Sequence, residues 1–205
     1  MTALAMAAVE EGPLAGVDLE LAPGQIAWLR GPSGSGKTLL LYVAAGLRVP
    51  AAGSVTVNGS QPGPGRAAML FQNPDYQLLA ATVGADVRLN AASPAAAAQA
   101  LERTGSAAWA ETGVTALSPG QRRITALAGV LATEAPLLLL DTPFAGMARG
   151  EAERLWSAAR AFALERDAAV LATGEPPREG PADPTLEVEL WHREPPSEPP
   201  SSSIP

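Results

Sequence analysis

The spacing of apolar residues changes several times along the chain, and each spacing predicts a different kind of element. Alternating apolar and polar residues at 17–21 (VDLEL) predict a half-buried strand, and four consecutive leucines at 137–140 predict a buried parallel strand. By the same reasoning, strands are expected at residues 3–9, 25–30, 54–57, 67–71, 168–172 and, at the edge of a sheet, 185–191.

Helical segments lie between these strands. Helices are expected at residues 38–45, 119–131 and 150–166, and in an insertion at 82–111, where Ser93-Pro94 opens one of them. The alternation of strand, loop and helix predicts an α/β fold, in which a mostly parallel sheet carries helices on its faces.

Composition limits the classes of protein that this pattern fits. Of the 205 residues, 47% are hydrophobic, which suffices for the core of one sizeable domain. The formal net charge is −7 and no run of basic residues occurs, so a nucleic-acid partner is not expected. The absence of cysteine excludes disulfides and thiolate metal sites.

Neither a membrane span nor a secretory signal is predicted. No apolar run reaches the roughly 18 to 20 residues that a membrane helix needs. Residues 1–12 contain two glutamates and no basic residue, unlike a signal peptide. We therefore expect a soluble, cytoplasmic chain with one domain at 1–192, followed at 193–205 by a disordered tail rich in Pro and Ser.

A glycine-rich loop carries the clearest chemistry. It matches the pattern G-x-x-x-x-G-K-[ST] in full with Gly31, Pro32, Ser33, Gly34, Ser35, Gly36, Lys37 and Thr38. Gly34 and Gly36 let the backbone fold around an anion, at which successive N–H groups then point. Lys37 is expected to reach the β- and γ-phosphates, and the Thr38 hydroxyl to ligate Mg²⁺. The loop therefore predicts binding of a nucleoside triphosphate.

Three further segments follow this loop in a recognisable order. Residues 117–121 (LSPGQ) resemble the LSGGQ signature of ATP-binding-cassette (ABC) ATPases. Residues 137–147 (LLLLDTPFAGM) resemble their Walker B and D-loop segment, and residues 70–75 (LFQNPD) resemble their Q-loop. The resemblance covers about residues 15–175. It implies the P-loop NTPase (ABC ATPase) fold, with an antiparallel β-subdomain and a short helical subdomain at about 73–131.

The resemblance also implies roles outside the glycine-rich loop. Asp141 and Gln72 would join Thr38 at the Mg²⁺ ion that accompanies ATP. The signature would contact the γ-phosphate of an ATP molecule held by a second ATPase subunit in a head-to-tail dimer. The residues expected at that contact are Ser118, Gly120 and Gln121. An ordinary helix N-cap followed by proline also explains Ser118, and both interpretations can hold together.

Several positions depart from the family pattern, and the main ones concern hydrolysis. Thr142 stands where the family has a glutamate that acts as general base, and Gly174 stands where it has a switch histidine. Losing a positioned base typically costs roughly 10²- to 10⁴-fold in rate. We therefore expect ATP to bind here but to be hydrolysed slowly or not at all. Further departures are Ala148 at the D-loop aspartate, Pro119 in the signature, and residues 3–13, which offer adenine no aromatic ring and only apolar contact through Val9.

Residues 71–83 (FQNPDYQLLAATV) look most like the cobalt and energy-coupling-factor importers of this family. The resemblance implies a second ABC ATPase as partner, in a heterodimer with a competent subunit or otherwise a homodimer. It also implies a transmembrane transporter subunit, so the chain would lie on the inner face of the cell membrane. Asp75 and Asp86 would contact that subunit, or would be solvated carboxylates at helix ends.

Functions outside transport remain open from the sequence. A non-hydrolysing switch would use ATP binding alone to drive dimerisation, and the missing glutamate and histidine favour it. A degraded paralogue without activity is a third interpretation, against which the intact glycine-rich loop argues. A small-molecule kinase would have no need of residues 117–121. The transported substrate and the choice of ATP over GTP are not encoded in these motifs.

Overall fold

The computed structural model describes residues 2–175 and 186–190, and its strands form two sheets. One sheet is antiparallel, in the order β2-β1-β4, and the other is parallel, in the order β5-β6-β7-β3-β8. The strands are β1 (Leu4–Glu11), β2 (Leu14–Leu21), β3 (Ile26–Arg30), β4 (Ala52–Val57), β5 (Ala67–Leu70), β6 (Leu137–Leu140), β7 (Ala169–Thr173) and β8 (Leu186–Glu189).

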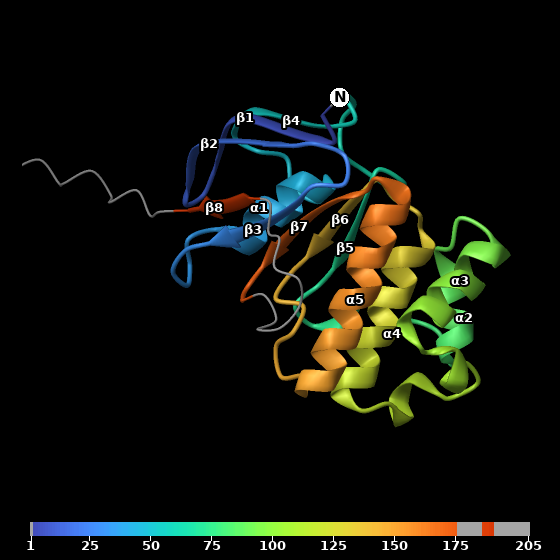
Figure 1. Cartoon of the computed structure of the whole chain (residues 1–205). Coiled ribbons are helices and arrows are strands. Elements are labelled where there is room, and N and C mark those ends of the chain that lie inside the picture. Colours follow the sequence, from blue (N-terminus) through green and yellow to red (C-terminus); the bar gives the residue numbers. More distant parts are fainter. Residues whose placement is uncertain (1, 176–185, 191–205) are drawn as a thin grey trace, which may run out of the picture.

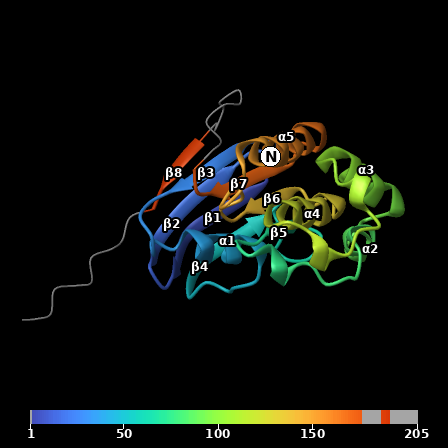
Figure 2. The same ribbon diagram turned by 90° about the horizontal axis from the view of Figure 1, so that it is seen from below.

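Helices cover both faces of the parallel sheet, as Figures 1 and 2 show. Helix α1 lies between the two sheets, α4 and α5 lie against the opposite face, and α2 and α3 pack beyond α4. The helices are α1 (Lys37–Ala45), α2 (Val83–Leu89), α3 (Pro94–Thr104), α4 (Pro119–Ala132) and α5 (Arg149–Arg166), with single 3₁₀ turns η1 (Pro74–Tyr76), η2 (Ala107–Trp109) and η3 (Val114–Ala116).

The α/β fold predicted from the sequence is confirmed, with its parallel sheet, antiparallel β-subdomain and helical insertion. Every predicted strand and helix is present in the described residues, with ends that differ by at most three positions from those predicted. Strand β8 lies at the sheet edge, beside β3, as expected. Residues 185 and 191 of the strand predicted at 185–191, and the tail at 193–205, lie outside the described residues.

The parallel sheet separates two apolar layers, and β6 shows how one strand serves both. Leu137 and Leu139 pack with α1 and the antiparallel sheet, whereas Leu138 and Leu140 pack with α4 and α5. All four leucines are fully buried. Successive side chains of a strand point to opposite faces, so a strand covered on both sides needs an uninterrupted apolar run.

Asp75 and Asp86, which the sequence analysis considered as surface carboxylates, differ in burial. Asp86 is buried, and its Oδ1 atom accepts from the N–H groups of Leu79 (2.6 Å) and Ala80 (2.8 Å). The interpretation of Asp86 as a solvated helix-end carboxylate is therefore wrong, because the carboxylate is buried and orders the loop before α2, whereas its contact with a partner subunit stays a prediction. Asp75 is exposed and pairs with Arg122 of α4 at 3.1 Å.

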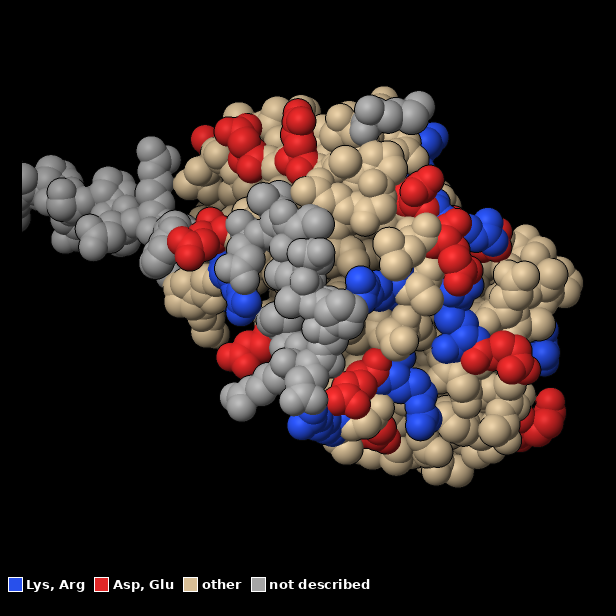
Figure 3. Space-filling view, viewed as in Figure 1, with Lys and Arg blue, Asp and Glu red and all other residues tan. Residues whose placement is uncertain are grey.

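No helix among residues 2–175 and 186–190 is long and apolar enough to cross a membrane. On the face seen in Figure 3, acidic side chains lie over the β-rich part, and both signs are interspersed over the helical part. Charged side chains also join separate helices, since Arg103 of α3 makes a bidentate contact with Glu165 of α5.

Candidate functional site

The glycine-rich loop joins β3 to α1 and leaves the start of that helix open. Gly36 is its N-cap, and no side chain accepts a hydrogen bond from the first turn. Helices α2, α3 and α4, by contrast, begin with a threonine or serine whose side chain accepts from that turn. Uncapped N–H groups at the positive end of a helix dipole attract anions, so the start of α1 suits a phosphate.

Two glycines of the loop are also required by packing. Gly31 has φ +138°, and a Cβ atom there would strike the main-chain oxygen of Leu190, just after β8. Gly36 has φ +91°, and a Cβ atom there would strike the side chain of Leu14. The phosphate cradle is therefore one of two causes for glycine at position 36, and the sequence did not reveal the second.

Lys37 is folded back over the loop. Its Nζ atom donates to the main-chain oxygens of Gly31 (2.9 Å) and Pro32 (2.7 Å) and to Ser35 Oγ (3.4 Å). An ammonium group has three donors, so these contacts use all of them. A triphosphate would replace loop oxygens as the acceptor and bring a full negative charge to the ammonium.

Asp141 follows β6 and is held by two hydroxyl groups. Thr38 Oγ1 donates to its Oδ2 atom (2.9 Å), and Thr173 Oγ1 donates to its Oδ1 atom (2.7 Å). Thr173 Oγ1 also accepts from the N–H of Thr142 (2.8 Å). Strands β6 and β7 end side by side and α1 starts next to them, which brings together residues that are 103 and 32 positions apart.

These oxygen atoms fit a magnesium site. A cavity of about 450 Å³ is lined by Thr38, Asp141, Gln72 and the glycine-rich loop. Hydroxyl, carboxylate and amide oxygens are the hard ligands that Mg²⁺ takes alongside phosphates and water. Thr38 and Asp141 would hold the ion, with Gln72 next to it. When bound, the ion would neutralise charge on the β- and γ-phosphates.

Residues 117–121 lead into the N-terminus of α4, and their polar groups form hydrogen bonds with one another. Ser118 Oγ accepts from the N–H of Gln121 (3.2 Å), and Gln121 Oε1 accepts from the N–H of Ser118 (2.9 Å). This reciprocal capping box confirms the N-cap prediction for Ser118. Ser118 is exposed and Gly120 is buried. Contact of these residues with a second subunit's phosphate stays a prediction.

Arg123, which the sequence analysis missed, ties α4 to the site. Its buried guanidinium donates to the main-chain oxygens of Gln72 (2.9 Å) and Thr142 (3.2 Å). Burial lowers the pKa of this guanidinium, while the negative charge of Asp141 opposes that effect. A signal for Arg123 was present, since it lies four positions before the buried Leu127, on the apolar face of the helix.

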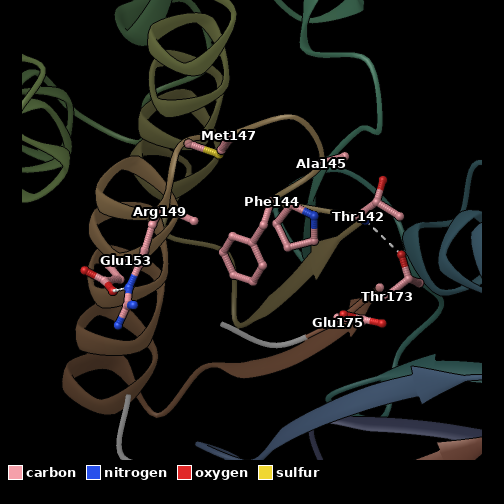
Figure 4. A pocket seen from close by; sticks show the side chains of 11 residues that line it. Thr142, Phe144, Ala145, Met147, Arg149, Glu153, Thr173 and Glu175 are labelled. Carbon is pink, nitrogen blue, oxygen red and sulfur yellow. Dashed lines mark hydrogen bonds and ion pairs between the residues drawn. The ribbon is translucent and has the colours of Figure 1, made fainter. Parts of the chain in front are cut away.

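A second hollow, of about 500 Å³ (Figure 4), adjoins the cavity of Thr38 and Asp141, because Thr142 and Thr173 line both. Phe144 lies at its centre in the view, and Arg149 and Glu153 pair at its rim (2.8 Å). Thr142 and Gly174 line it and face each other, because a Cβ atom at 174 would lie 3.5 Å from Thr142 Cα. Thr142 and Gly174, where the resemblance leads us to expect a glutamate and a histidine, are thus neighbours, and neither carries an ionisable group.

The expected apolar contact of Val9 with adenine is wrong. Val9 is fully buried in β1, within the core between the sheets, so no ligand reaches it. The connection from β1 to β2 is only two residues long, at Gly12 and Pro13. The described residues thus offer no aromatic ring at this turn.

Fold and site together define a class of protein. A glycine-rich loop between a strand of a parallel sheet and a helix, facing an aspartate at the end of another strand of that sheet, is typical of nucleoside triphosphate-binding P-loop domains. Within that class the chain belongs to the ABC transporter family, because the model of the family described as ABC transporter matches residues 14–145.

Individual relatives agree with this assignment. An ABC transporter ATP-binding protein of Gloeobacter violaceus is 37% identical over 151 residues, which are 65% of this chain and 62% of that protein. The energy-coupling factor transporter ATP-binding protein EcfA1 of Symbiobacterium thermophilum is 37% identical over 148 residues, 64% of this chain and 52% of that protein. The chain thus spans less than two thirds of the length of these relatives.

Solved structures share the fold at lower identity. The structure of cbiO1 from Clostridium perfringens, described as part of the ABC transporter complex cbiONQ, superposes with a TM-score of 0.74. It is 23% identical and covers 85% of this chain and 78% of its own. At this identity the likeness concerns the fold alone.

Proposed function

We propose that this chain is the ATP-binding subunit of an ABC transporter and binds Mg-ATP at residues 31–38. The observation that carries the proposal is the meeting of Thr38 and Asp141, at 2.9 Å, beside the uncapped start of α1. The helix N-terminus and Lys37 would take the phosphates, and the two oxygen ligands would take the metal. ATP rather than GTP is proposed from the names of the relatives alone.

The same site supports holding ATP better than cutting it. A general base must lie within hydrogen-bond reach of the attacking water, and neither Thr142 nor Gly174 offers a group that takes up a proton near neutral pH. Glu175 is exposed and follows Gly174, outside the nucleotide cavity. We therefore propose that hydrolysis is slow or absent at the site built on this chain's own loop.

A surface hollow next to the Q-loop supports a membrane partner. This hollow, of about 660 Å³, is lined partly by Tyr76 and Leu79, which are 75% and 74% exposed. Large apolar side chains that are so exposed around a concavity are typical of protein interaction sites. We propose that a transmembrane transporter subunit docks here, with the chain on the inner face of the membrane. The likeness to EcfA1 and cbiO1 supports an energy-coupling-factor or cobalt-type importer.

Dimerisation is the remaining part of the proposal. Ser118, Gly120 and Gln121 stand in a signature-like segment at the start of α4, although Thr142 and Gly174 offer no base. Those two facts fit a heterodimer in which a competent second ABC ATPase supplies the base and this chain supplies the signature. A homodimer would contain no complete site.

The proposal is tested by the reactivity and charge of Lys37, the only lysine in the sequence. An amine-reactive reagent followed by mass spectrometry should modify Lys37, and Mg-ATP should protect it. By calorimetry, Lys37→Ala should weaken Mg-ATP binding at least about tenfold, because the ammonium would otherwise pair with phosphate oxygens. Arg66→Ala, which removes one exposed positive charge elsewhere, is the matched control and should bind as the wild type does. Equal binding by Lys37→Ala would refute the site.

A non-hydrolysing ATP-dependent switch outside transport is the second candidate, favoured by the unionisable pair at Thr142 and Gly174. The two candidates differ in their partners. Co-expression with a neighbouring ABC ATPase and a multi-span membrane protein should give a stable complex, with turnover appearing only in the complex, if the chain acts in transport. Nucleotide-dependent self-association without any such complex favours the switch.

A further inference from the structure

Thr142 combines two unfavourable features at one position. Its Oγ1 atom is buried and has no hydrogen-bond partner among the residues that the structure describes. Its backbone has φ +44°, in the left-handed region, which a β-branched side chain rarely adopts. A hydroxyl buried without a partner and a strained backbone both cost stability, so the surrounding contacts must hold this residue in place.

Those contacts bind the N–H and the carbonyl oxygen of Thr142 and do not include its hydroxyl. Its N–H donates to Thr173 Oγ1 (2.8 Å), and its carbonyl oxygen accepts from Arg123 Nη1 (3.2 Å). Thr173 and Arg123 come from different elements, β7 and α4. Figure 4 shows Thr142 and Thr173 adjacent at the ends of β6 and β7. The strain is therefore imposed by the architecture of the site and not by a loose loop.

The position of Thr142 indicates which hydrogen-bond acceptor its hydroxyl could meet when a nucleotide is bound. Thr142 lines both hollows, together with Thr173, and directly follows Asp141. Asp141 and Thr38 mark the metal end of the nucleotide cavity, where the γ-phosphate would arrive beside Lys37. An oxyanion there has several acceptor sites, and a threonine hydroxyl has one proton to donate.

We propose that the Thr142 hydroxyl donates a hydrogen bond to the γ-phosphate, directly or through one water, and thereby makes this site prefer ATP to ADP. The inference rests on the proposed nucleotide binding and adds a role for the residue that replaces the family's glutamate. A carboxylate at this position would repel the phosphate and activate water, whereas a hydroxyl attracts the phosphate and cannot take up a proton at neutral pH. A threonine at this position would thus support binding of ATP, where a glutamate would support its hydrolysis.

The proposal predicts opposite effects of one substitution on stability and on binding. Thr142→Val keeps the β-branched shape but removes the unpaired hydroxyl, so the nucleotide-free protein should melt a few degrees higher, about 2–4 °C. The same variant should bind Mg-ATP about tenfold more weakly and bind Mg-ADP as the wild type does, because ADP lacks the γ-phosphate. Thr142→Ser, which keeps the hydroxyl, should retain the wild-type ratio of ATP to ADP affinity.

Thr125 offers a matched control within the same chain. Its Oγ1 atom is also buried without a partner in the described residues, but it lies in α4 and lines neither hollow. Thr125→Val should raise the melting temperature of the nucleotide-free protein similarly and leave both affinities unchanged. Melting is followed by calorimetry without nucleotide, and affinities by titration with Mg-ATP and Mg-ADP.

The outcomes separate this inference from the proposal beneath it. An unchanged ratio of ATP to ADP affinity in Thr142→Val overturns the role of the hydroxyl and leaves nucleotide binding intact. A lower melting temperature in that variant, with both affinities reduced alike, identifies the hydroxyl as structural and also overturns the inference. If the wild-type chain binds neither nucleotide while Thr125→Val folds normally, the proposed function itself fails, and the inference fails with it.

Discussion

Asp141 has both carboxylate oxygens occupied by hydroxyl donors, from Thr38 and Thr173. Each is a hydrogen bond to a charged acceptor, and such bonds are stronger than those between neutral groups. The carboxylate is therefore oriented before any metal arrives. A bound Mg²⁺ ion would use the same two oxygen atoms, Thr38 Oγ1 and Asp141 Oδ2, that the hydrogen bond now joins.

Asp141→Asn tests this arrangement at the level of one atom. The substitution removes the negative charge and turns an amide N–H group, a donor, toward one of the two threonine hydroxyls that now donate to the carboxylate. We therefore expect the free energy of unfolding to fall by about 1–2 kcal/mol. The gain in ATP affinity on adding Mg²⁺ should disappear, whereas affinity measured in EDTA should not decrease. Glu20→Gln, which removes an exposed carboxylate on β2, is the control. An undiminished response of Asp141→Asn to Mg²⁺ would exclude this carboxylate as a metal ligand.

At this scale the sequence identified residues through contiguous motifs and missed those that act through space. Lys37, Thr38 and Asp141 stand in motifs with known spacing. Thr173 and Arg123 reach Asp141 and the main chain of Thr142 from other elements, so nothing next to them in the sequence marks their role. A polar residue that ends a buried strand, as Thr173 does in β7, is the one local signal for it.

Elements begin and end where capping residues dictate. Ser93 and Ser118 cap α3 and α4 through their side chains, and Gly46 and Gly105 end α1 and α3 with positive φ. These signals are local, so helix bounds could be predicted from the sequence to within a residue or two. Contacts between elements could not. Asp86 had the pattern of a helix-end carboxylate, yet the loop before α2 folds over it and buries it.

The pairing of α3 with α5 depends on pH through Arg103 and Glu165. The hydrogen bond from Arg103 lowers the pKa of Glu165 below its ordinary value of 4.5. A carboxyl group with a lowered pKa in the folded state stabilises that state above the unfolded pKa, and this stabilisation is lost as pH falls through the folded pKa. Because Glu165 is exposed, the effect is small and screened by salt.

Glu165→Gln should therefore melt at a lower temperature than the wild type at pH 7. The difference should shrink as the pH falls below about 4.5, since the wild-type carboxyl then also becomes neutral. High salt should reduce it as well. Glu153→Gln removes a pair within α5 and should change the melting temperature less, because that contact joins no second element. A difference that persists unchanged in acid would assign the contact to packing. Thermal melts across pH 3–8 make the comparison.

The whole molecule places α1, whose N-terminus has no side-chain cap, between two sheets, and places the capped helix α4 on the other face of the parallel sheet. Alternation within β6 ties both layers to one strand, and Asp141 follows that strand directly into the site. That helices cover the faces of a mostly parallel sheet followed from the sequence, because strands and helices alternate along it. The length of the turn from β1 to β2 did not follow from the sequence. This turn has only two residues, Gly12 and Pro13, and neither is an aromatic residue that could stack on adenine.

These scales meet in one claim, that this molecule holds ATP without cutting it. In our proposal the phosphate loop, the oriented Asp141 and the hydroxyl of Thr142 serve binding, while Thr142 and Gly174 themselves offer no group that takes up a proton near neutral pH. On this proposal, the absence of a positioned base would lower the rate of hydrolysis roughly 10²- to 10⁴-fold.

The most direct test is to measure binding and steady-state phosphate release on the same preparation of the purified chain with Mg-ATP. The account predicts saturable binding that Lys37→Ala weakens, with phosphate release no greater than in Lys37→Ala. Ordinary steady-state turnover by the chain alone, abolished by Lys37→Ala, would contradict it.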